Sequence, residues 1–111
     1  MNNEISVEIG DGVKLVILIQ VQKGKQQQQI ELYEKIRPLV LEEEGCLQYE
    51  LSRVVGNNEQ FVLIECWESQ RYLDLHDQTA HMIEADKLSA SFREVPATVL
   101  TLSHLDINNN E

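Results

Sequence analysis

Two segments of this sequence carry apolar side chains on both of their alternating faces, and they restrict the fold more than any other feature. VKLVILIQV at residues 13–21 and EQFVLIECW at residues 59–67 are rich in β-branched and long aliphatic side chains. A strand with this pattern is buried on both sides, so the sheet that contains it needs cover on both faces.

A helix is predicted between these two strands, over residues 25–44. Its apolar positions follow helical spacing at Ile30, Tyr33, Ile36 or Arg37, and Val40. Gln26–Gln29 is expected to form a solvated first turn, because glutamine is a good helix former. Pro38 is expected to bend the helix or to begin a second segment, since it removes one backbone donor.

The rest of the ordered chain is predicted as a hairpin, a helical region and a last strand. In order, the elements are a strand at 46–55, the turn Gly56-Asn57-Asn58, a strand at 59–67, a helix at 70–77 capped by Ser69, its continuation from the cap Thr79 to about Phe92, and a strand at 97–105.

Two registers of the hairpin are open. A two-residue turn at Asn57-Asn58 places Glu50 opposite Glu65, whereas a one-residue bulge places Tyr49 there instead. Glu65 is unusual in either register because its strand neighbours are apolar. A hydrogen bond to Glu65 from Arg53, from Tyr49 or from a partner chain is the structural explanation, and catalysis is the functional one.

The order strand, helix, strand, strand, helix, strand predicts an α+β fold of the ferredoxin-like split βαβ type, with a four-stranded antiparallel sheet. Its helices can cover one face of the sheet, so a second copy of the chain is expected on the other face, as a homodimer. The domain is assigned to residues 13–104. Residues 1–12 are an edge strand or a mobile segment, and residues 105–111 a polar tail.

Composition excludes several kinds of partner. The 111 residues suit one domain, and 9 basic against 19 acidic residues give a net charge of -10, which disfavours nucleic acid and anionic membrane surfaces. No membrane-spanning or signal segment is recognised, so a cytoplasmic protein is expected. Cys46 and Cys66 match no metal or disulfide pattern and are expected to be buried free thiols.

Three blocks of the sequence resemble the antibiotic biosynthesis monooxygenase domain family. They are GCLQYEL at residues 45–51, FVLIECWES at 61–69 and YLDLHDQTAHM at 72–82, and the resemblance covers about residues 13–104. It implies a dimeric α+β barrel. Activities in the family include cofactor-independent oxygenation of phenols or quinols, haem degradation and processing of a phosphorylated sugar. The blocks are most similar to the bacterial quinol monooxygenase branch.

Haem degradation is disfavoured by particular residues. Relatives with that activity carry an asparagine in the first strand, a tryptophan in the second helix and an axial histidine after it. The positions that correspond in this sequence hold Ile17, His76 and Asp86. No haem or other cofactor is therefore expected.

Oxygenation without a cofactor needs an apolar slot, a base and a donor for the developing oxyanion. His76 is the best base, because imidazole titrates near neutral pH, and Tyr72 lies on the same helical face, one turn earlier. Trp67 is expected to stack on a planar substrate, and Glu65 is a second ionisable candidate. Each also has a packing explanation, as a residue of the ordinary core.

Further substrate contacts are expected from Tyr49, His81 and Met82. The spacing of His76 and His81 does not place both on one helical face, so no metal site is predicted.

The sequence leaves three functions open. The first is oxidation of a small quinol-like or polyphenolic molecule by O₂. The second is an isomerase or lyase acting on a small sugar-like metabolite, which would need a cationic clamp, with Arg37 and Arg53 as the basic residues near the inferred site. The third is a dimeric binding or stress-response module without chemistry, for which a sealed, side-chain-filled interior is expected. A flat, open pocket favours the first.

Overall fold

The computed structural model describes residues 12–103 and residue 105. The elements in chain order are β1 (Val13–Gln20), α2 (Gln26–Leu41), β2 (Cys46–Val54), β3 (Asn57–Trp67), α3 (Gln70–Asp77), α4 (Ala80–Ser89) and β4 (Thr98–Leu102). The predicted order of strands and helices is confirmed. Most of the N-terminal segment, residues 1–11, and most of the polar tail, residues 106–111, lie outside the described residues.

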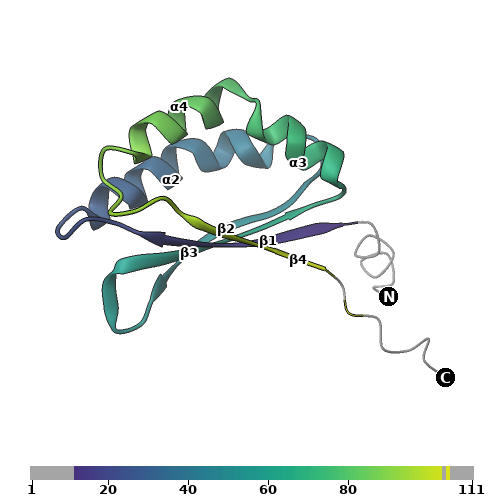
Figure 1. Cartoon of the computed structure of the whole chain (residues 1–111). Coiled ribbons are helices and arrows are strands. Elements are labelled where there is room, and N and C mark those ends of the chain that lie inside the picture. Colours follow the sequence, from purple (N-terminus) through teal and green to yellow (C-terminus); the bar gives the residue numbers. More distant parts are fainter. Residues whose placement is uncertain (1–11, 104, 106–111) are drawn as a thin grey trace.

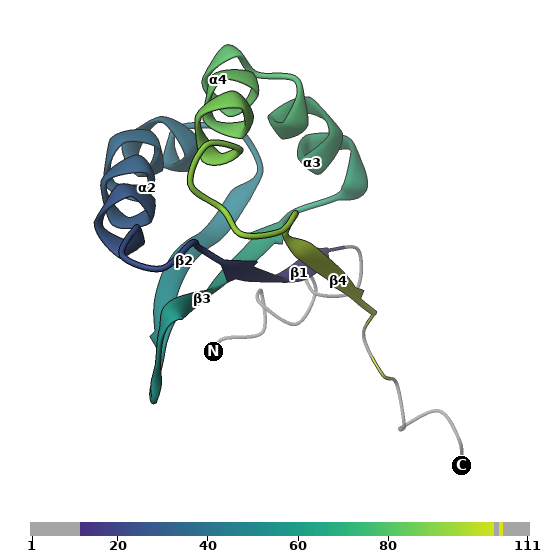
Figure 2. The same cartoon turned by 60° about the vertical axis from the view of Figure 1, so that its left-hand side comes forward.

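The four strands form one antiparallel sheet in the order β2-β3-β1-β4, which is the predicted ferredoxin-like arrangement. β1 pairs with β3 from Val13 opposite Trp67 to Gln20 opposite Gln60. The two strands that are apolar on both faces are therefore the central pair, where burial is greatest. Helices α2, α3 and α4 lie together on one face of the sheet (Figures 1 and 2). None of the helices in the described part of the chain is long and apolar enough to span a membrane.

The other face of the sheet points away from all three helices (Figure 1). Neighbouring strands place apolar side chains side by side on it, at Val16, Leu18, Val62, Ile64, Leu100 and Leu102. Leu100 and Leu102 remain 46% and 43% exposed. This outer sheet face is the surface for which the sequence predicts a second layer of cover.

The hairpin adopts the bulged register, with Tyr49 opposite Glu65. The two-residue turn at Asn57-Asn58 is wrong, because the chain already turns at Val55-Gly56 and the asparagines begin β3. Glycine at position 56 has φ +87°, a left-handed conformation that costs glycine little. This register puts Tyr49 and Glu65 on the helix-covered face and Glu50 on the opposite one.

Helix α2 buries Gln29, Leu32, Ile36 and Val40. Ile36 and Val40 are buried as predicted, whereas the first half of the helix buries the residues one position before Ile30 and Tyr33. Ile30 and Tyr33 are half-buried. The solvated first turn is wrong for Gln29, which is 4% exposed because its side chain lies over the sheet and accepts hydrogen bonds from Arg93. The helix also continues through Pro38 without a second segment. Pro38 is on the exposed side, where water can bond the carbonyl that it leaves free.

Candidate functional site

A cavity of about 200 Å³ lies between the helices and the sheet. Its apolar lining is Ile17, Ile19, Leu32, Ile36, Leu51, Leu63, Met82, Ala85, Ala97 and Val99. Its polar lining is Gln29, Tyr33, Tyr49, Glu65, His76, Asp77, Asp86, Ser89 and Arg93. The interior is thus not the sealed, side-chain-filled core expected of a module without a ligand site.

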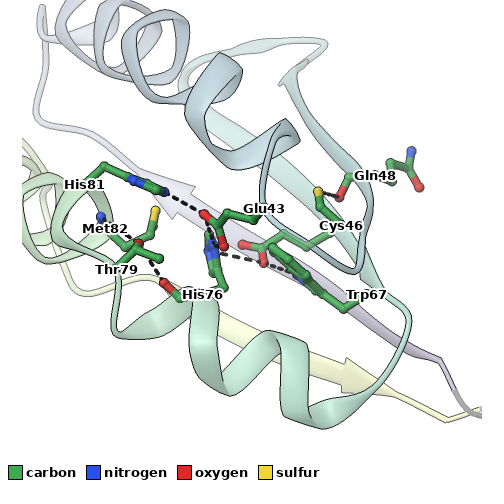
Figure 3. A network of polar contacts seen from close by, with 9 residues as sticks. Glu43, Cys46, Gln48, Trp67, His76, Thr79, His81 and Met82 are labelled. Carbon is green, nitrogen blue, oxygen red and sulfur yellow. Dashed lines mark hydrogen bonds and ion pairs between the residues drawn. The ribbon is translucent and has the colours of Figure 1, made fainter.

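His76, in α3, is held at this cavity by a carboxylate from the turn that follows α2. Its Nδ1 lies 2.9 and 3.0 Å from the two carboxylate oxygens of Glu43, in the turn that follows α2. The second of these oxygens also lies 2.6 Å from Nε2 of His81, at the start of α4. Figure 3 shows the Glu43 carboxylate between the two imidazole rings.

The junction between α3 and α4 explains why both rings reach Glu43. Thr79 occupies the N-cap of α4, and its side-chain oxygen accepts a hydrogen bond from the backbone N–H of Met82. The same hydroxyl donates to the carbonyl oxygen of His76 at 2.9 Å (Figure 3). This predicted cap therefore fixes the end of α3 against the start of α4, with His76 and His81 on either side.

The Glu43 contact decides the tautomer of His76. A carboxylate accepts hydrogen bonds, so Nδ1 carries the proton and Nε2 of the neutral ring keeps its lone pair. Nε2 lies 3.9 Å from Oε1 of Glu65, which is beyond hydrogen-bonding distance. The ring is 1% exposed and lines the cavity, so Nε2 is a buried nitrogen with a free lone pair, on a ring whose other nitrogen contacts the Glu43 carboxylate. A proton taken up there would sit between the carboxyl groups of Glu43 and Glu65.

Glu65 enters the site from β3 and is 4% exposed. Burial raises the pKa of its carboxyl, against a hydrogen bond from Trp67 and the nearby His76, which favour the charged form. The indole N–H of Trp67 donates to Oε1 of Glu65 at 3.0 Å. The Trp67 and His76 ring centroids are 4.6 Å apart, so the indole supports both the imidazole ring and the Glu65 carboxyl.

Tyr49 lies across the hairpin from Glu65 and completes the polar side of the cavity. Its ring meets His76 edge-on, with centroids 5.9 Å apart, and stacks on Tyr33 at 6.1 Å. Burial and the Glu65 charge raise the pKa of its hydroxyl, so this group stays protonated and can donate a hydrogen bond. Tyr33 donates instead to the backbone carbonyl of Tyr49, at 3.1 Å, which holds the strand and helix together.

The structure brings together four of the seven candidate residues. His76, Glu65, Tyr49 and Met82 line the cavity. Of the described residues, Trp67, Tyr72 and His81 are not in its lining. Trp67 is completely buried beneath the His76 ring, so stacking directly on a substrate does not fit its position, and His81 contacts Glu43.

Tyr72 packs against the turn before β2 rather than into the cavity. A Cβ atom added at Gly45 would lie 2.2 Å from Cγ of the Tyr72 ring, so glycine permits this close approach. Gly45 also has φ +86°. The Tyr72 hydroxyl donates to Glu44 at 3.3 Å. Tyr72 thereby supports the turn that carries Glu43. The sequence had suggested a place beside the substrate, because Tyr72 and His76 share a helical face.

The family model for the antibiotic biosynthesis monooxygenases matches residues 12–88, well over half of the 111 residues. The chain belongs to this family. The match covers β1 through α4 and hence most elements that line the cavity. Among curated proteins, none matches the sequence significantly.

Solved structures have the same fold as this family member at low sequence identity. A conserved protein from Methanosarcina mazei Go1 has a TM-score of 0.84 and 22% identity over 88% of this chain and 97% of its own. A candidate antibiotic biosynthesis monooxygenase from Nitrosomonas europaea gives 0.82 and 18%, over 86% and 92%. An antibiotic biosynthesis monooxygenase gives 0.79 and 22%, over 85% and 99%. At these identities the likeness shows the fold.

The sequence did not identify the residue that orients His76. Glu43 lies in the run Glu42-Glu43-Glu44 just beyond α2. By sequence, all three glutamates are equally expected to be solvated side chains at the end of a helix. Only the packing of that turn on α3 and α4 selects Glu43.

The cationic group of the cavity also differs from the prediction. It is Arg93, whereas Arg37 and Arg53 are not in the described lining. Arg37 instead pairs with Glu50 at 2.9 Å on the outside of the molecule. A bridge between Val21 and Arg93 brings the segment after α4 back to the end of β1, which no local pattern around Arg93 indicated.

Residues 12–103 and 105 include no group of three or more His, Cys, Asp or Glu side chains arranged to hold a metal ion. The cysteines are half-buried free thiols. Burial raises the pKa of Cys46 to about 11 and raises that of Cys66.

Proposed function

We propose that this family member is a monooxygenase that oxidises a small quinol-like phenol with O₂ and without a cofactor. One observation supports this most: a largely apolar cavity contains a buried histidine whose Nδ1 is held by a carboxylate and whose Nε2 is left for a ligand. Family membership supports the reaction class.

The size of the cavity favours a substrate of one or two rings. An apolar cavity of about 150 Å³ holds a benzene molecule, so about 200 Å³ leaves room for a substituted ring but not for a large polycyclic molecule. The apolar walls, which include Ile17, Leu63 and Met82, lower the local dielectric constant around the ring and so strengthen the electrostatic effect of the polar groups.

His76 is proposed as the general base. Its Nε2 accepts the phenolic proton, and the resulting imidazolium is stabilised by Glu43 at Nδ1 and by the carboxyl of Glu65 on the other side. Tyr49 remains protonated and donates a hydrogen bond to the phenolate oxygen. The substrate therefore becomes an anion in a site already polarised to hold it.

The phenolate supplies the electrons. It passes one electron to O₂, and the two radicals combine to form a C–O bond at a ring carbon that bears hydrogen. The peroxide takes back the proton held by His76, and the O–O bond breaks as that carbon loses its hydrogen. The sum is phenol plus O₂ giving quinone plus water, so the reaction needs no external reductant.

The test compares two histidines that share Glu43 but differ in their access to the cavity. Oxygen uptake and quinone formation are measured over a panel of monocyclic and bicyclic quinols and phenols for the native protein, His76→Gln and His81→Gln. Loss of the general base should lower kcat by about 10²- to 10⁴-fold in His76→Gln. His81→Gln, the matched control, should keep most of the activity, since His81 lies outside the described lining.

Two results would contradict the proposal. One is a panel that is consumed at the same rate with and without protein, or at the same rate under nitrogen. The other is equal kcat in His76→Gln and the native protein. With ¹⁸O₂, one labelled oxygen should appear in the quinone and the other in water.

A second reaction class is favoured by one observation, the presence of Arg93 in the cavity lining. A cationic group beside a buried base also suits an isomerase acting on a small polar metabolite. Such an enzyme would turn over equally fast without O₂, so the nitrogen experiment separates the two reactions.

A homodimer is proposed to form through the outer sheet face. This proposal is supported by the continuous apolar surface of Val16, Leu18, Ile64, Leu100 and Leu102 on adjacent strands. Sheet-on-sheet packing of two copies would be expected to bury on the order of 2,000 Å² in total. Sedimentation equilibrium at micromolar concentration should give twice the mass of the chain, and a stable folded monomer would contradict the dimer.

A further inference from the structure

We infer that the end of the cavity at Arg93 and Gln29 is a subsite for a carboxylate, so that the ligand is a hydroxylated aromatic acid. The inference deepens the proposed function by naming the substrate class for the same cavity. It rests on the proposed function only in taking this cavity as the binding site.

Arg93 has far more hydrogen-bonding capacity than its neighbours use. Its Nε and Nη2 donate to Oε1 of Gln29 at 3.3 and 3.2 Å. A guanidinium has five N–H donors, so three of them have no partner among the described residues. No ion pair of Arg93 occurs within residues 12–103 and 105 either. A neutral amide oxygen holds the side chain in place but provides no negative charge in direct contact with the guanidinium.

Gln29 is oriented by the same contact. Arginine can only donate hydrogen bonds, so Oε1 must be the atom that faces Arg93, and the side-chain NH₂ points elsewhere. Gln29 is 4% exposed and lines the cavity, and within the described chain its NH₂ donates to no other residue. No fully buried polar side-chain atom of the described residues lacks a partner, so this NH₂ is not sealed inside the protein. Because Gln29 lines the cavity, the cavity is the space that we infer its NH₂ to face. Two adjacent side chains thus offer donors to one acceptor.

A carboxylate suits these donors better than a neutral oxygen does. Burial lowers the pKa of Arg93, which means that its charge is held at a cost that an anion in the cavity would offset. Asp86 also lines the cavity and acts on Arg93, but it is exposed at the surface, where water screens it. The guanidinium fork matches the two oxygens of a carboxylate.

The carboxylate end and the base end of the cavity face each other along the sheet. Arg93 bridges to Val21, directly after β1, and Glu65 pairs with Leu15, six residues before Val21. In extended chain this separation is about 20 Å between backbones. Arg93 and Glu65 both line the cavity, so the length of their side chains shortens this gap. Tyr49 lies between them, since it contacts His76 and responds to the charge of Arg93. One or two rings can therefore join a carboxylate at Arg93 to a hydroxyl at His76.

The test measures binding rather than turnover. Calorimetric titrations under nitrogen compare 4-hydroxybenzoate with 4-hydroxybenzamide, and 6-hydroxy-2-naphthoate with its amide, so that each pair differs in charge at one position. For the pair that fits, the acid should bind the native protein about ten- to a hundredfold more tightly than the amide, as expected for a charge-assisted contact. The net charge of -10 repels anions at long range, so a preference for the acid must come from a local site.

Three variants locate the effect. Arg93→Gln should bring the ratio of the two dissociation constants close to one, and Arg37→Gln, which removes the same charge at an exposed site, should leave it unchanged. Gln29→Glu should also bring the ratio close to one, because it gives Arg93 a carboxylate of its own. This variant keeps the arginine, so it tests the inference even where Arg93→Gln fails to fold.

The inference is overturned if neither acid binds at millimolar concentration, if acid and amide bind equally in both pairs, or if the preference survives both Arg93→Gln and Gln29→Glu. These outcomes are distinct from failure of the proposed oxidation. An acid preference that depends on Arg93, in a protein that consumes no O₂, supports the subsite and contradicts the oxygenase. Oxygen consumption without any preference for the acid supports the oxygenase and contradicts the carboxylate subsite.

Discussion

Replacing Gly45 with alanine should destabilise this protein more than the same change at Gly56, although the two glycines have almost the same backbone conformation. Their φ angles are +86° and +87°. A Cβ at Gly45 would lie 2.2, 2.5 and 2.6 Å from atoms of Tyr72, whereas a Cβ at Gly56 would have nothing within 4 Å. The pair therefore separates the backbone cost from the cost of the collision.

The magnitude follows from these two terms. A left-handed conformation costs an alanine about 1 to 2 kcal/mol, which is the whole effect expected for Gly56→Ala. Distances far inside van der Waals contact force Tyr72 or the turn to move, and overpacking of this kind adds about 1 to 3 kcal/mol. Gly45→Ala should thus lower the free energy of unfolding by about 2 to 5 kcal/mol.

Urea unfolding followed by the fluorescence of Trp67, the one tryptophan in the sequence, measures both variants. Protein concentration is held constant because the stability of an oligomer depends on it. A Tyr72→Ala background provides the control for the collision, since Gly45→Ala should there cost no more than Gly56→Ala.

Equal destabilisation by Gly45→Ala and Gly56→Ala would refute the reasoning. So would an unchanged cost of Gly45→Ala after Tyr72 is removed. Either result would mean that the ring of Tyr72 does not support the turn that carries Glu43.

Three other perturbations test the site. Glu43→Gln should lower kcat by about a hundredfold or more, because an amide can turn its NH₂ toward Nδ1 of His76 and select the wrong tautomer. Unchanged kcat in steady-state kinetics would contradict this. Glu65→Gln should stabilise the protein more at pH 7 than at pH 4.5. Burial raises the folded-state pKa of Glu65, so the native carboxyl adds stability at low pH that is lost as the pH rises through that value. The urea midpoints of Glu65→Gln and the native protein should therefore move apart as the pH rises, and midpoints that converge would contradict this. Labelling of Cys46 with iodoacetamide at pH 8 should be about a hundredfold slower than in urea, since its thiol pKa is raised from 9.0 to about 11, and equal rates by mass spectrometry would exclude this burial.

The catalytic candidates divide according to what local sequence can express. His76, Glu65 and Tyr49 were recognisable because each is a polar or ionisable group in a segment that periodicity predicts to be buried. Their arrangement around one cavity agrees with that expectation. Trp67 and Tyr72 were recognisable for the same reason, but periodicity does not distinguish a side chain beside a cavity from one packed underneath it.

The hairpin illustrates a choice that the sequence narrowed to two possibilities. Both registers satisfied the pattern of apolar residues, and each left Glu65 opposite a polar side chain. The turn lies two residues earlier than the asparagines suggested, at Val55 and the left-handed Gly56, and a register shift between Arg53 and Val54 leaves Tyr49 opposite Glu65. A one-residue difference decides which face a side chain occupies, and here it placed Tyr49 beside the cavity.

The sequence by itself determined the α+β fold, because two strands that are apolar on both faces and an alternating order of elements admit few other arrangements. Only the tertiary structure decided which carboxylate and which cation serve the cavity. Glu43 is one of three consecutive glutamates, and Arg93 follows the last helix with no distinguishing pattern. Their partners lie 33 and 64 residues away, at His76 and Gln29. A contact across such separations depends on how helices pack over the sheet, whereas periodicity reports only which face of its own element a residue occupies.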